Sequence, residues 1–159
     1  MTDRTRVLFV CLGNICRSPL AEGIFLREIE AHGIADRFHV DSAGTGAWHV
    51  GERADPRSIA MGESIGCRME MRTRQIRAQD FEDFDLLLAM DRANLRDLQT
   101  IAKRYGFETD LRLMREFDSH GTGEDVPDPY YGGPDGFRDV ADMLERSCRG
   151  LLRHLGQLR

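Results

Sequence analysis

Near the N-terminus, five residues separate Cys11 from Arg17, and the intervening sequence is Leu-Gly-Asn-Ile-Cys. An apolar run precedes this segment and Ser-Pro-Leu-Ala-Glu follows it, which predicts a loop that links a strand to a helix. A tight loop of this kind directs backbone NH groups, and the positive end of the helix dipole, at one place. The residues therefore indicate an anion site with a nucleophilic thiol inside it.

Each side chain of the segment suits that chemistry. Electropositive surroundings favour the thiolate form of Cys11, which is the nucleophilic form of cysteine. Arg17 is able to donate two parallel hydrogen bonds to two phosphate oxygens, which a lysine is not. Gly13 permits unusual backbone dihedral angles, and Asn14 tolerates a left-handed one. Ser18 is expected to cap the N-terminus of the helix.

The elements that must position this loop follow from the pattern of apolar residues. Strands are predicted at residues 7–10, 38–43, 86–89 and 111–114, and helices at residues 18–32, 91–106 and 137–155. Asp91 is expected to cap the second helix, which ends near Gly106, and Cys148, on the apolar face of the third, is expected to pack in the core. This alternation predicts an α/β fold with a central four-stranded parallel sheet and helices on both faces. Right-handed crossovers gather the carboxyl ends of the strands on one edge, so Cys11, Ser42 and Met90 are expected to lie together there.

Length and composition are those of an ordinary soluble globular protein. The chain has 159 residues, of which 41% are hydrophobic and 31% charged, and a single domain over residues 1–159 is expected. The apolar run near the N-terminus is too short for a signal peptide or a membrane span, so a cytoplasmic location is the default expectation. A net charge of -5 argues against nucleic acid as the main partner.

Three separated motifs carry a resemblance to a known family. They are Val-Cys-Leu-Gly-Asn-Ile-Cys-Arg-Ser-Pro-Leu-Ala-Glu at residues 10–22, Asp-Ser-Ala-Gly-Thr at 41–45 and Asp-Pro-Tyr-Tyr-Gly-Gly at 128–133. In these motifs and in their order the chain resembles the low-molecular-weight protein tyrosine phosphatases, and the resemblance covers nearly its whole length. It implies hydrolysis of phosphotyrosine and small aryl phosphates, with a phosphate-binding loop after the first strand and without a metal or other cofactor.

The resemblance also implies a two-step reaction. Cys11 attacks phosphorus to form a phosphocysteine, Arg17 binds the phosphate, and Asp128 protonates the leaving oxygen and then deprotonates the attacking water. From the residues alone, an aspartate between two prolines is more often a turn residue. The match to Asp-Pro-Tyr-Tyr favours Asp128 as the acid, with Asp118 and Asp125 as weaker alternatives.

Further residues are expected, by family position, to form or support the phosphate site. They are Leu12, Gly13, Asn14, Ile15, Cys16, Ser18 and Ser42. Ser18 is expected to hydrogen-bond the sulfur of Cys11, in addition to its role as helix cap. In the family a serine and a histidine steady the loop asparagine, and Ser42 and Asn14 match the positions of that serine and that asparagine. Here Met71 stands where many members have the histidine, so a water or another side chain is expected to replace it, or the loop to be slightly less rigid.

An aromatic slot is expected to select the substrate, because a deep slot admits a phenyl ring and excludes phosphoserine and phosphothreonine. Trp48, Tyr130 and Tyr131 are its expected walls, with Leu12 beside them. The only tryptophan, Trp48, lies in a polar stretch, where an exposed aromatic ring suggests contact with a ligand. A branch of the family that dephosphorylates arginine carries threonine at the position of Ile15, so the isoleucine favours phosphotyrosine.

Three alternatives to a tyrosine phosphatase stay open: an arsenate reductase of the same fold, a protein arginine phosphatase and a non-catalytic phosphotyrosine-binding module. The reductase needs a cysteine pair near residues 80–90, which contain none. The binding module would be expected to lack Cys11 or Asp128. The expected partners are phosphotyrosine proteins and a cognate tyrosine kinase; neither nucleic acid nor a membrane is expected, and the chain is expected to be a monomer or a weak dimer.

Overall fold

The computed structural model describes residues 4–121, 123–130 and 133–158. Its four strands are β1 (Thr5–Cys11), β2 (Phe38–Gly44), β3 (Leu86–Ala89) and β4 (Asp110–Leu113). They form one sheet in the order β2-β1-β3-β4, and all neighbouring strands are parallel. Each predicted strand overlaps an observed one, and the predicted four-stranded parallel sheet is confirmed.

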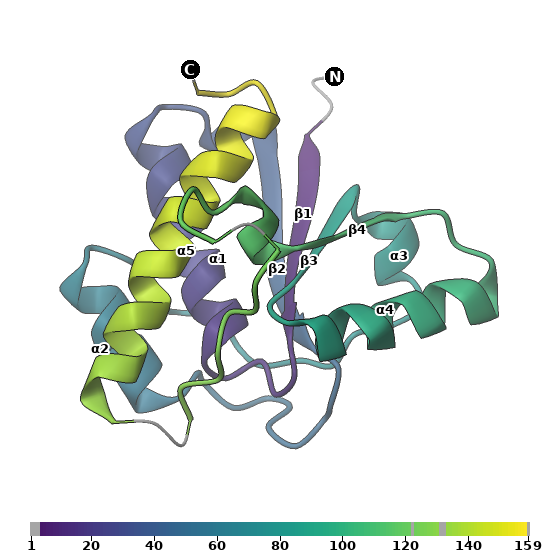
Figure 1. The fold of residues 1–159 in the computed structure, drawn as a ribbon, viewed down its shortest axis with the longest axis horizontal. Coiled ribbons are helices and arrows are strands. Elements are labelled where there is room, and N and C mark those ends of the chain that lie inside the picture. Colours follow the sequence, from purple (N-terminus) through teal and green to yellow (C-terminus); the bar gives the residue numbers. More distant parts are fainter. Residues whose placement is uncertain (1–3, 122, 131–132, 159) are drawn as a thin grey trace.

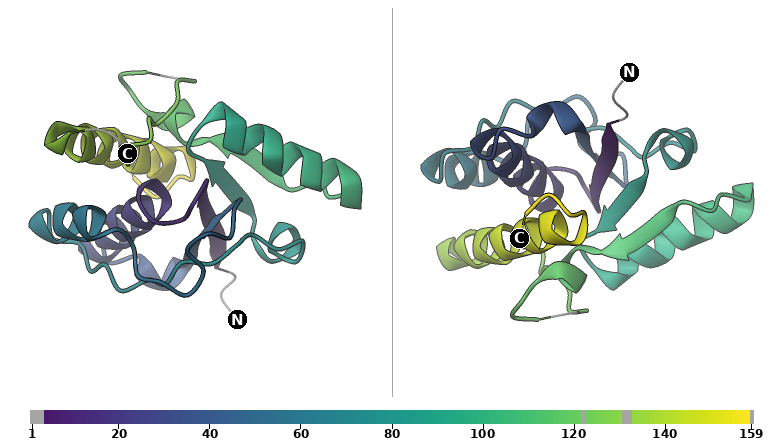
Figure 2. Two further views of the ribbon diagram at one scale, coloured as in Figure 1. Left: turned by 90° about the horizontal axis from the view of Figure 1, so that it is seen from below. Right: turned by 90° about the horizontal axis from the view of Figure 1, so that it is seen from above.

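The two faces of the sheet carry different helices (Figure 1, Figure 2). On one face lie α1 (Arg17–Ala31) and α5 (Pro134–His154), with α2 (Pro56–Ser64) packed against both; on the other lie α3 (Asp80–Asp83) and α4 (Arg92–Tyr105). The short 3-10 helices η1 (Ala35–Arg37) and η2 (Met114–Phe117) precede β2 and follow β4. The prediction of helices on both faces is confirmed.

The side chains of β1 show why both faces must be covered. Val7 and Phe9 pack with α1 and α5, whereas Leu8 and Val10 point to the opposite face and pack with α3 and α4. All four side chains are fully buried. A central parallel strand is buried on both faces and therefore reads as a continuous apolar run, as it does in this sequence.

The ends of α4 are those that the sequence predicts. The carboxylate of Asp91 accepts a hydrogen bond from the NH of Asn94 at 2.7 Å, and the Asn94 side chain accepts one from the NH of Asp91 at 3.2 Å. Gly106 ends the helix in the left-handed conformation, with φ 74°. Because α4 begins directly after β3, this reciprocal cap fixes Asp91 at the carboxyl edge of the sheet.

Three connections meet at that edge (Figure 1). Cys11 ends β1 beside Gly44 of β2, and the NH of Met90, just after β3, donates to the carbonyl of Val10 at 3.0 Å. The carbonyl of Met90 accepts in turn from the NH of Val126 at 2.8 Å. The segment after η2 is thereby brought back to the edge where β1 ends.

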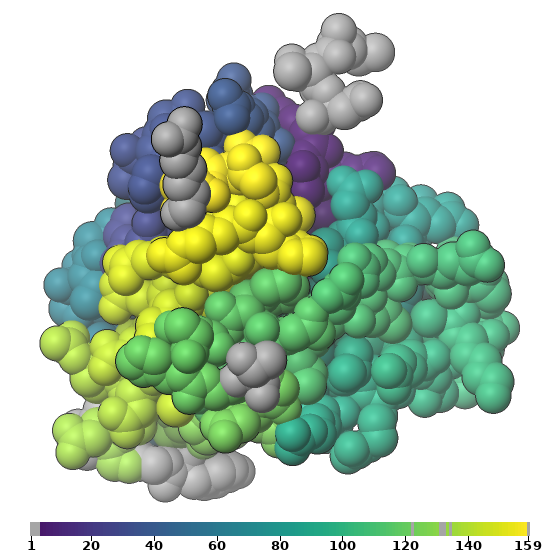
Figure 3. Space-filling view, turned by 45° about the horizontal axis from the view of Figure 1, so that its top comes forward, coloured from purple at the N-terminus to yellow at the C-terminus, as the bar shows by residue number. Residues whose placement is uncertain are grey.

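The last helix closes the fold. α5 packs against α1 and η2, and Figure 3 shows it in yellow beside the green segment that contains η2. Its predicted apolar face is buried, and Cys148 is a core residue with 0% exposure, as predicted. No helix in the described part of the chain has the length and apolar character needed to cross a bilayer.

Candidate active site

The cysteine loop, residues 11–16, runs from the end of β1 to the start of α1. Cys11 is buried, and its Sγ accepts a hydrogen bond from the NH of Asn14 at 3.3 Å and lies 3.0 Å from Oγ of Ser18. The side-chain amide of Asn14 donates to that same Oγ at 2.8 Å. Since Ser18 accepts from the amide, its own hydrogen is free to point at the sulfur. The sulfur therefore has two donors, as a thiolate needs.

One local expectation for this loop is wrong. α1 begins at Arg17 without a side-chain cap, and Ser18 lies inside its first turn, because the hydroxyl is engaged with Cys11 and Asn14 instead. The left-handed conformation expected at Asn14 is confirmed, with φ 56°. The expected contact between Ser18 and the cysteine sulfur is also present.

The neighbouring segments bind the carbonyl groups of the loop. On the β2 side, the NH groups of Thr45 and Gly46 donate to the carbonyls of Cys11 and Leu12, each at 2.9 Å. Two further loop carbonyls accept bonds from the start of α2. Among the described residues, the NH groups of 13, 15 and 16 have no partner. The loop therefore offers NH groups to an anion while its carbonyl oxygens are occupied elsewhere.

Residue 44, at the end of β2, must be glycine because the backbone of the cysteine loop lies against it. A Cβ at this position would lie 2.8 Å from the carbonyl oxygen of Leu12 and 3.1 Å from the backbone nitrogen of Asn14. Backbone atoms have little freedom to yield, so any larger residue would displace the loop.

Asn14 is anchored by a backbone group. Its side chain is buried, and Oδ1 accepts a hydrogen bond from the NH of Arg74 at 2.9 Å. The guanidinium of Arg74 is itself fixed by Asp41 at 3.0 Å and Asp80 at 2.9 Å. Met71 packs against the hydrophobic core. The expected substitute for the missing histidine is thus a peptide NH rather than a water or a side chain.

Ser42 does not steady Asn14 as expected. Its hydroxyl donates instead to Oε1 of Glu22, on α1, at 2.6 Å. Burial raises the pKa of Glu22 to about 7, since the hydrogen bond from Ser42 and the charge of Arg74 offset it only in part and Asp41 adds to it. A carboxyl group that titrates near neutral pH therefore lies behind the cysteine loop.

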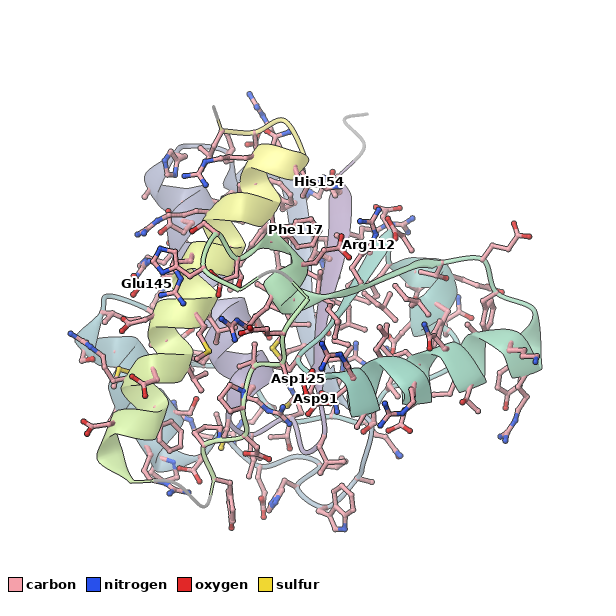
Figure 4. All side chains as sticks on the ribbon, in the orientation of Figure 1. Asp91, Arg112, Phe117, Asp125, Glu145 and His154 are labelled. Atoms are coloured by element: carbon pink, nitrogen blue, oxygen red, sulfur yellow. The ribbon has the colours of Figure 1, made fainter. Side chains whose placement is uncertain are left out.

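Arg17 reaches the cavity from the first turn of α1. It is buried, and its Nη1 donates to Asp91 at 2.7 Å and to the carbonyl of Val126 at 3.0 Å. Figure 4 labels Asp91 at the start of α4. These two acceptors hold the guanidinium on one side, and Nη2 lies 3.7 Å from the carboxylate of Asp128.

Asp128 belongs to the aspartate loop, residues 126–130. Its Oδ1 accepts a hydrogen bond from the NH of Tyr130 at 3.0 Å, and its side chain is 43% exposed. The carboxylate therefore closes a turn, as the residues alone suggested, and also faces the cavity, as the family resemblance implied. Asp125 accepts from the NH of Arg92, and Asp118 binds Arg115 and Arg146, so both weaker candidates are engaged in other hydrogen bonds.

One cavity of about 330 Å³ brings most of the predicted residues together. It is lined by Cys11, Leu12, Gly13, Ile15, Cys16, Arg17, Trp48, His49, Asp128 and Tyr130. Trp48 and Tyr130, two of the three residues expected to form the aromatic wall, are 69% and 38% exposed. Asn14, Ser18 and Ser42 are buried and lie outside this lining. Tyr131, the third expected wall, lies outside the described residues.

The second cysteine of the loop differs from the first. Burial raises the pKa of Cys16 to about 12, and the negative charges of Asp55 and Asp128 add to this effect. Its thiol therefore stays uncharged at neutral pH. Of the two cysteines, only Cys11 combines donors on its sulfur with a nearby guanidinium.

Several residues of the site were not predicted from the sequence. Asp91 was predicted as a helix cap but not as the partner of Arg17, and His49, Asp55, Arg57 and Ser58 were not singled out. For α2 a signal existed, since Asp55-Pro56 is a typical start of a helix. No local signal reveals the pairing of Arg17 with Asp91, because 74 residues separate them.

Comparison with known proteins identifies the family. The family model described as Low molecular weight phosphotyrosine protein phosphatase matches residues 6–159. A low molecular weight phosphotyrosine protein phosphatase of Schizosaccharomyces pombe is 47% identical, over 98% of this chain and 99% of that protein.

Solved structures agree with this result. The crystal structure of a protein tyrosine phosphatase from Entamoeba histolytica superposes with a TM-score of 0.89 at 38% identity, covering 96% of this chain and 97% of that one. A Drosophila arginine phosphatase also superposes with a TM-score of 0.89, at 34% identity over 94% of this chain and 96% of that one. The chain belongs to the low-molecular-weight phosphotyrosine protein phosphatases, a family of hydrolases.

Proposed function

We propose that this chain dephosphorylates phosphotyrosine in proteins through a phosphocysteine, with Cys11 as nucleophile, Arg17 as phosphate ligand and Asp128 as general acid and base. The observation that carries this proposal is the meeting of the three side chains in one cavity with aromatic walls. The sulfur has hydrogen-bond donors, the guanidinium is fixed, and the carboxylate faces the same space.

In the first step the thiolate of Cys11 attacks phosphorus, and a sulfur–phosphorus bond forms as the bond to the phenolic oxygen breaks. Asp128 gives its proton to that oxygen, so tyrosine leaves as a neutral phenol. Arg17 and the NH groups of the cysteine loop stabilise the charge on the equatorial oxygens. Donors of this kind contribute about 3 to 4 kcal/mol each in comparable oxyanion sites.

In the second step a water molecule attacks phosphorus and Asp128, now a carboxylate, takes its proton. The sulfur–phosphorus bond breaks, phosphate leaves, and the thiolate of Cys11 returns. Ser18 Oγ, 3.0 Å from the sulfur, stabilises this leaving thiolate. Both steps therefore use the same carboxyl group in its two protonation states.

The decisive measurement is phosphate release from a phosphotyrosine peptide at mildly acid pH. We expect Cys11→Ser to abolish turnover, and Asp128→Asn to reduce it by roughly a hundredfold, since general acid catalysis supplies factors of this order. Acid quenching during turnover should trap phosphate on Cys11. A wild-type chain that binds the peptide without releasing phosphate would instead indicate a binding module.

Substrate choice is tested in the same assay. Ile15 lines the cavity and Trp48 and Tyr130 present their rings, which suits a phenyl group. We expect faster release from phosphotyrosine than from phosphoarginine peptides, and no reduction of arsenate with thioredoxin as the reductant. Faster release from phosphoarginine would place the chain with the arginine phosphatases despite its isoleucine.

A further inference from the structure

The first turn of α2 contacts both loops of the active site. On one side the NH of Asp55 donates to the carbonyl of Ile15 at 2.8 Å, and the hydroxyl of Ser58 donates to the carbonyl of Cys16 at 2.9 Å. Both acceptors belong to the cysteine loop. On the other side, the guanidinium of Arg57 reaches the aspartate loop. A single helical turn thus joins the loop of the nucleophile to the loop of the acid.

The contacts of Arg57 fix its guanidinium in one orientation. Nε and Nη2 each donate to one oxygen of Asp55 at 3.0 Å, and Nη1 is left to donate to the carbonyl of Tyr130 at 3.0 Å. The same carboxylate accepts from the NH of Arg57 at 2.9 Å, which caps α2. Hydrogen bonds from this guanidinium hold the pKa of Asp55 below its usual value, so the carboxylate stays charged.

Two aromatic rings complete the site of Arg57. Its guanidinium carbon lies 5.3 Å from the ring centre of Tyr130 and 4.9 Å from that of Phe137, which is buried in α5. A guanidinium at these distances is attracted by both rings. The arginine is therefore clamped between α2, the aspartate loop and the start of α5, although its side chain is about half exposed.

The backbone of Tyr130 connects Arg57 to the general acid, Asp128. Its NH donates to Oδ1 of Asp128, and its carbonyl accepts from Arg57, each at 3.0 Å. The carboxylate of Asp128 is 43% exposed, and Arg17 lies no closer than 3.7 Å. The position of Asp128 over the cavity thus depends on how the backbone at residue 130 is held.

Resting on the function proposed above, we infer that Arg57 is a positioning residue that places Asp128 for protonation of the leaving oxygen. The same turn of α2 then fixes the position of the aspartate loop relative to the cysteine loop. A merely structural arginine would stabilise the fold and affect every substrate alike. A positioning residue affects substrates in proportion to their need for an acid.

Leaving groups of different basicity separate these two roles. Phenyl phosphate and phosphotyrosine release strongly basic phenolates, whose conjugate acids have pKa values of about 10, whereas p-nitrophenyl phosphate releases a much weaker base that needs less help. We expect Arg57→Met, which keeps an unbranched stem but lacks the guanidinium, to lower kcat/KM for phenyl phosphate by about tenfold. For p-nitrophenyl phosphate the loss should be about twofold or less.

Three further variants test whether the effect depends on the contact of Arg57 with the aspartate loop. Arg53→Met removes another arginine of the segment that leads to α2, one that donates to the carbonyl of Met69 at 2.7 Å and not to the aspartate loop, and should change neither rate. In an Asp128→Asn background, Arg57→Met should lower kcat/KM for phenyl phosphate no further. Arg57→Lys, which retains one donor for Tyr130 but not the fork to Asp55, should fall between the wild type and Arg57→Met.

The inference is overturned if Arg57→Met lowers kcat/KM equally for both substrates, or if the loss persists in the Asp128→Asn background. Inhibition by inorganic phosphate, which reports the cysteine loop alone, should be unchanged. Should Arg57→Met fail to fold, as judged by its thermal melt, equal losses for both substrates with Arg57→Lys overturn the inference instead. A wild-type chain that hydrolyses neither aryl phosphate would refute the proposed function itself.

Discussion

A chain of hydrogen bonds, in which each group orients the next, ends at the sulfur of Cys11. The NH of Arg74 holds the amide of Asn14, the amide donates to the hydroxyl of Ser18, and the hydroxyl faces the sulfur of Cys11. Asn14 accepts one hydrogen bond and donates the next, and Ser18 accepts that bond. The hydroxyl hydrogen of Ser18 is therefore directed at the sulfur. Such a network is rigid because Asn14, Ser18 and Cys11 are buried.

Replacing Ser18 by alanine should therefore slow catalysis rather than unfold the protein. Without the hydroxyl, the thiolate that leaves in the second step loses a charge-assisted hydrogen bond, and we expect kcat to fall about tenfold. Steady-state kinetics with p-nitrophenyl phosphate measures this. Ser147→Ala is the control, since that hydroxyl is equally buried and has no hydrogen-bond partner among the residues that the structure describes. An unchanged kcat in Ser18→Ala would contradict the role.

The second prediction concerns Glu22, whose titration should make the free energy of unfolding depend on pH. Burial raises its pKa from 4.5 to about 7, so between these values the folded chain keeps a proton that the unfolded chain has lost. The free energy of unfolding should therefore fall as the pH rises through this window, by about 3 kcal/mol. Glu22→Gln keeps an acceptor for Ser42 but does not titrate.

Urea unfolding at pH 5 and pH 8 tests this expectation. Glu22→Gln should be more stable than the wild type at pH 8 and close to it at pH 5. Glu28→Gln is the matched control on the same helix, because Glu28 is buried but paired with Arg27 and Arg149, and its loss should destabilise the chain. Equal pH dependence in the wild type and Glu22→Gln would refute the assignment.

At the scale of elements, strong local patterns were predicted correctly and weak ones were missed. The strands β1 and β3 are apolar runs of strand length, α4 has apolar residues at helical spacing, and Asp91 and Gly106 mark the ends of that helix. α2 was missed because it is short and buries only Ser58 and Gly62, so it has no apolar stripe. The cap predicted at Ser18 was wrong because tertiary contacts compete for the same hydroxyl.

The contact between β2 and the cysteine loop predicts the effect of Gly44→Ala. The new methyl group would meet backbone atoms of Leu12 and Asn14, the nearest at 2.8 Å, so the loop must move. We expect inorganic phosphate to inhibit at least tenfold more weakly than in the wild type, since misplacement of binding groups by about 1 Å has effects of this order. Competitive inhibition measures the change, and unchanged inhibition would show that the loop adapts.

For the molecule as a whole, the site depends on contacts between segments far apart in the sequence. The residues of the cavity lie mainly in two motifs, and the sequence was sufficient to name Cys11, Arg17 and Asp128. Their partners come from other layers, such as Asp91 from α4 and Arg57 from α2. No periodicity or local motif indicates which distant side chains will meet, and this is why the contacts that support the site were predicted less well than the residues that line it.

Asp118 ties α5 to the rest of the fold from the end of η2. Its carboxylate is fully buried and accepts hydrogen bonds from Arg146 of α5 at 2.8 Å, from Arg115 of η2 at 2.9 Å and from the NH of His120 at 2.9 Å. Nearby, the rings of Phe117 and His154 lie 5.1 Å apart, and Figure 4 labels both. Arg115 also donates to the carbonyl of Asp125 at 3.2 Å, which connects this cluster to the approach to the aspartate loop.

Asp118→Asn should therefore weaken both the fold and the active site. Burial acts to raise the pKa of Asp118, but hydrogen bonds from Arg146, His120 and Arg115 hold it at about 2. Its contribution to stability is thus fully present above about pH 4 and is lost as the pH falls toward 2.

At pH 7 we expect the variant to lose about 3 kcal/mol in urea unfolding, because two guanidinium groups lose their shared carboxylate. The difference from the wild type should narrow as the pH falls from about 4 to 2, where the unfolded wild-type chain takes up a proton that the folded chain does not yet bind. Asp142→Asn, on the exposed side of α5, should change stability little at any pH. A difference between Asp118→Asn and the wild type that stays constant down to pH 2 would mean that the shape of the side chain, rather than its charge, holds α5 in place.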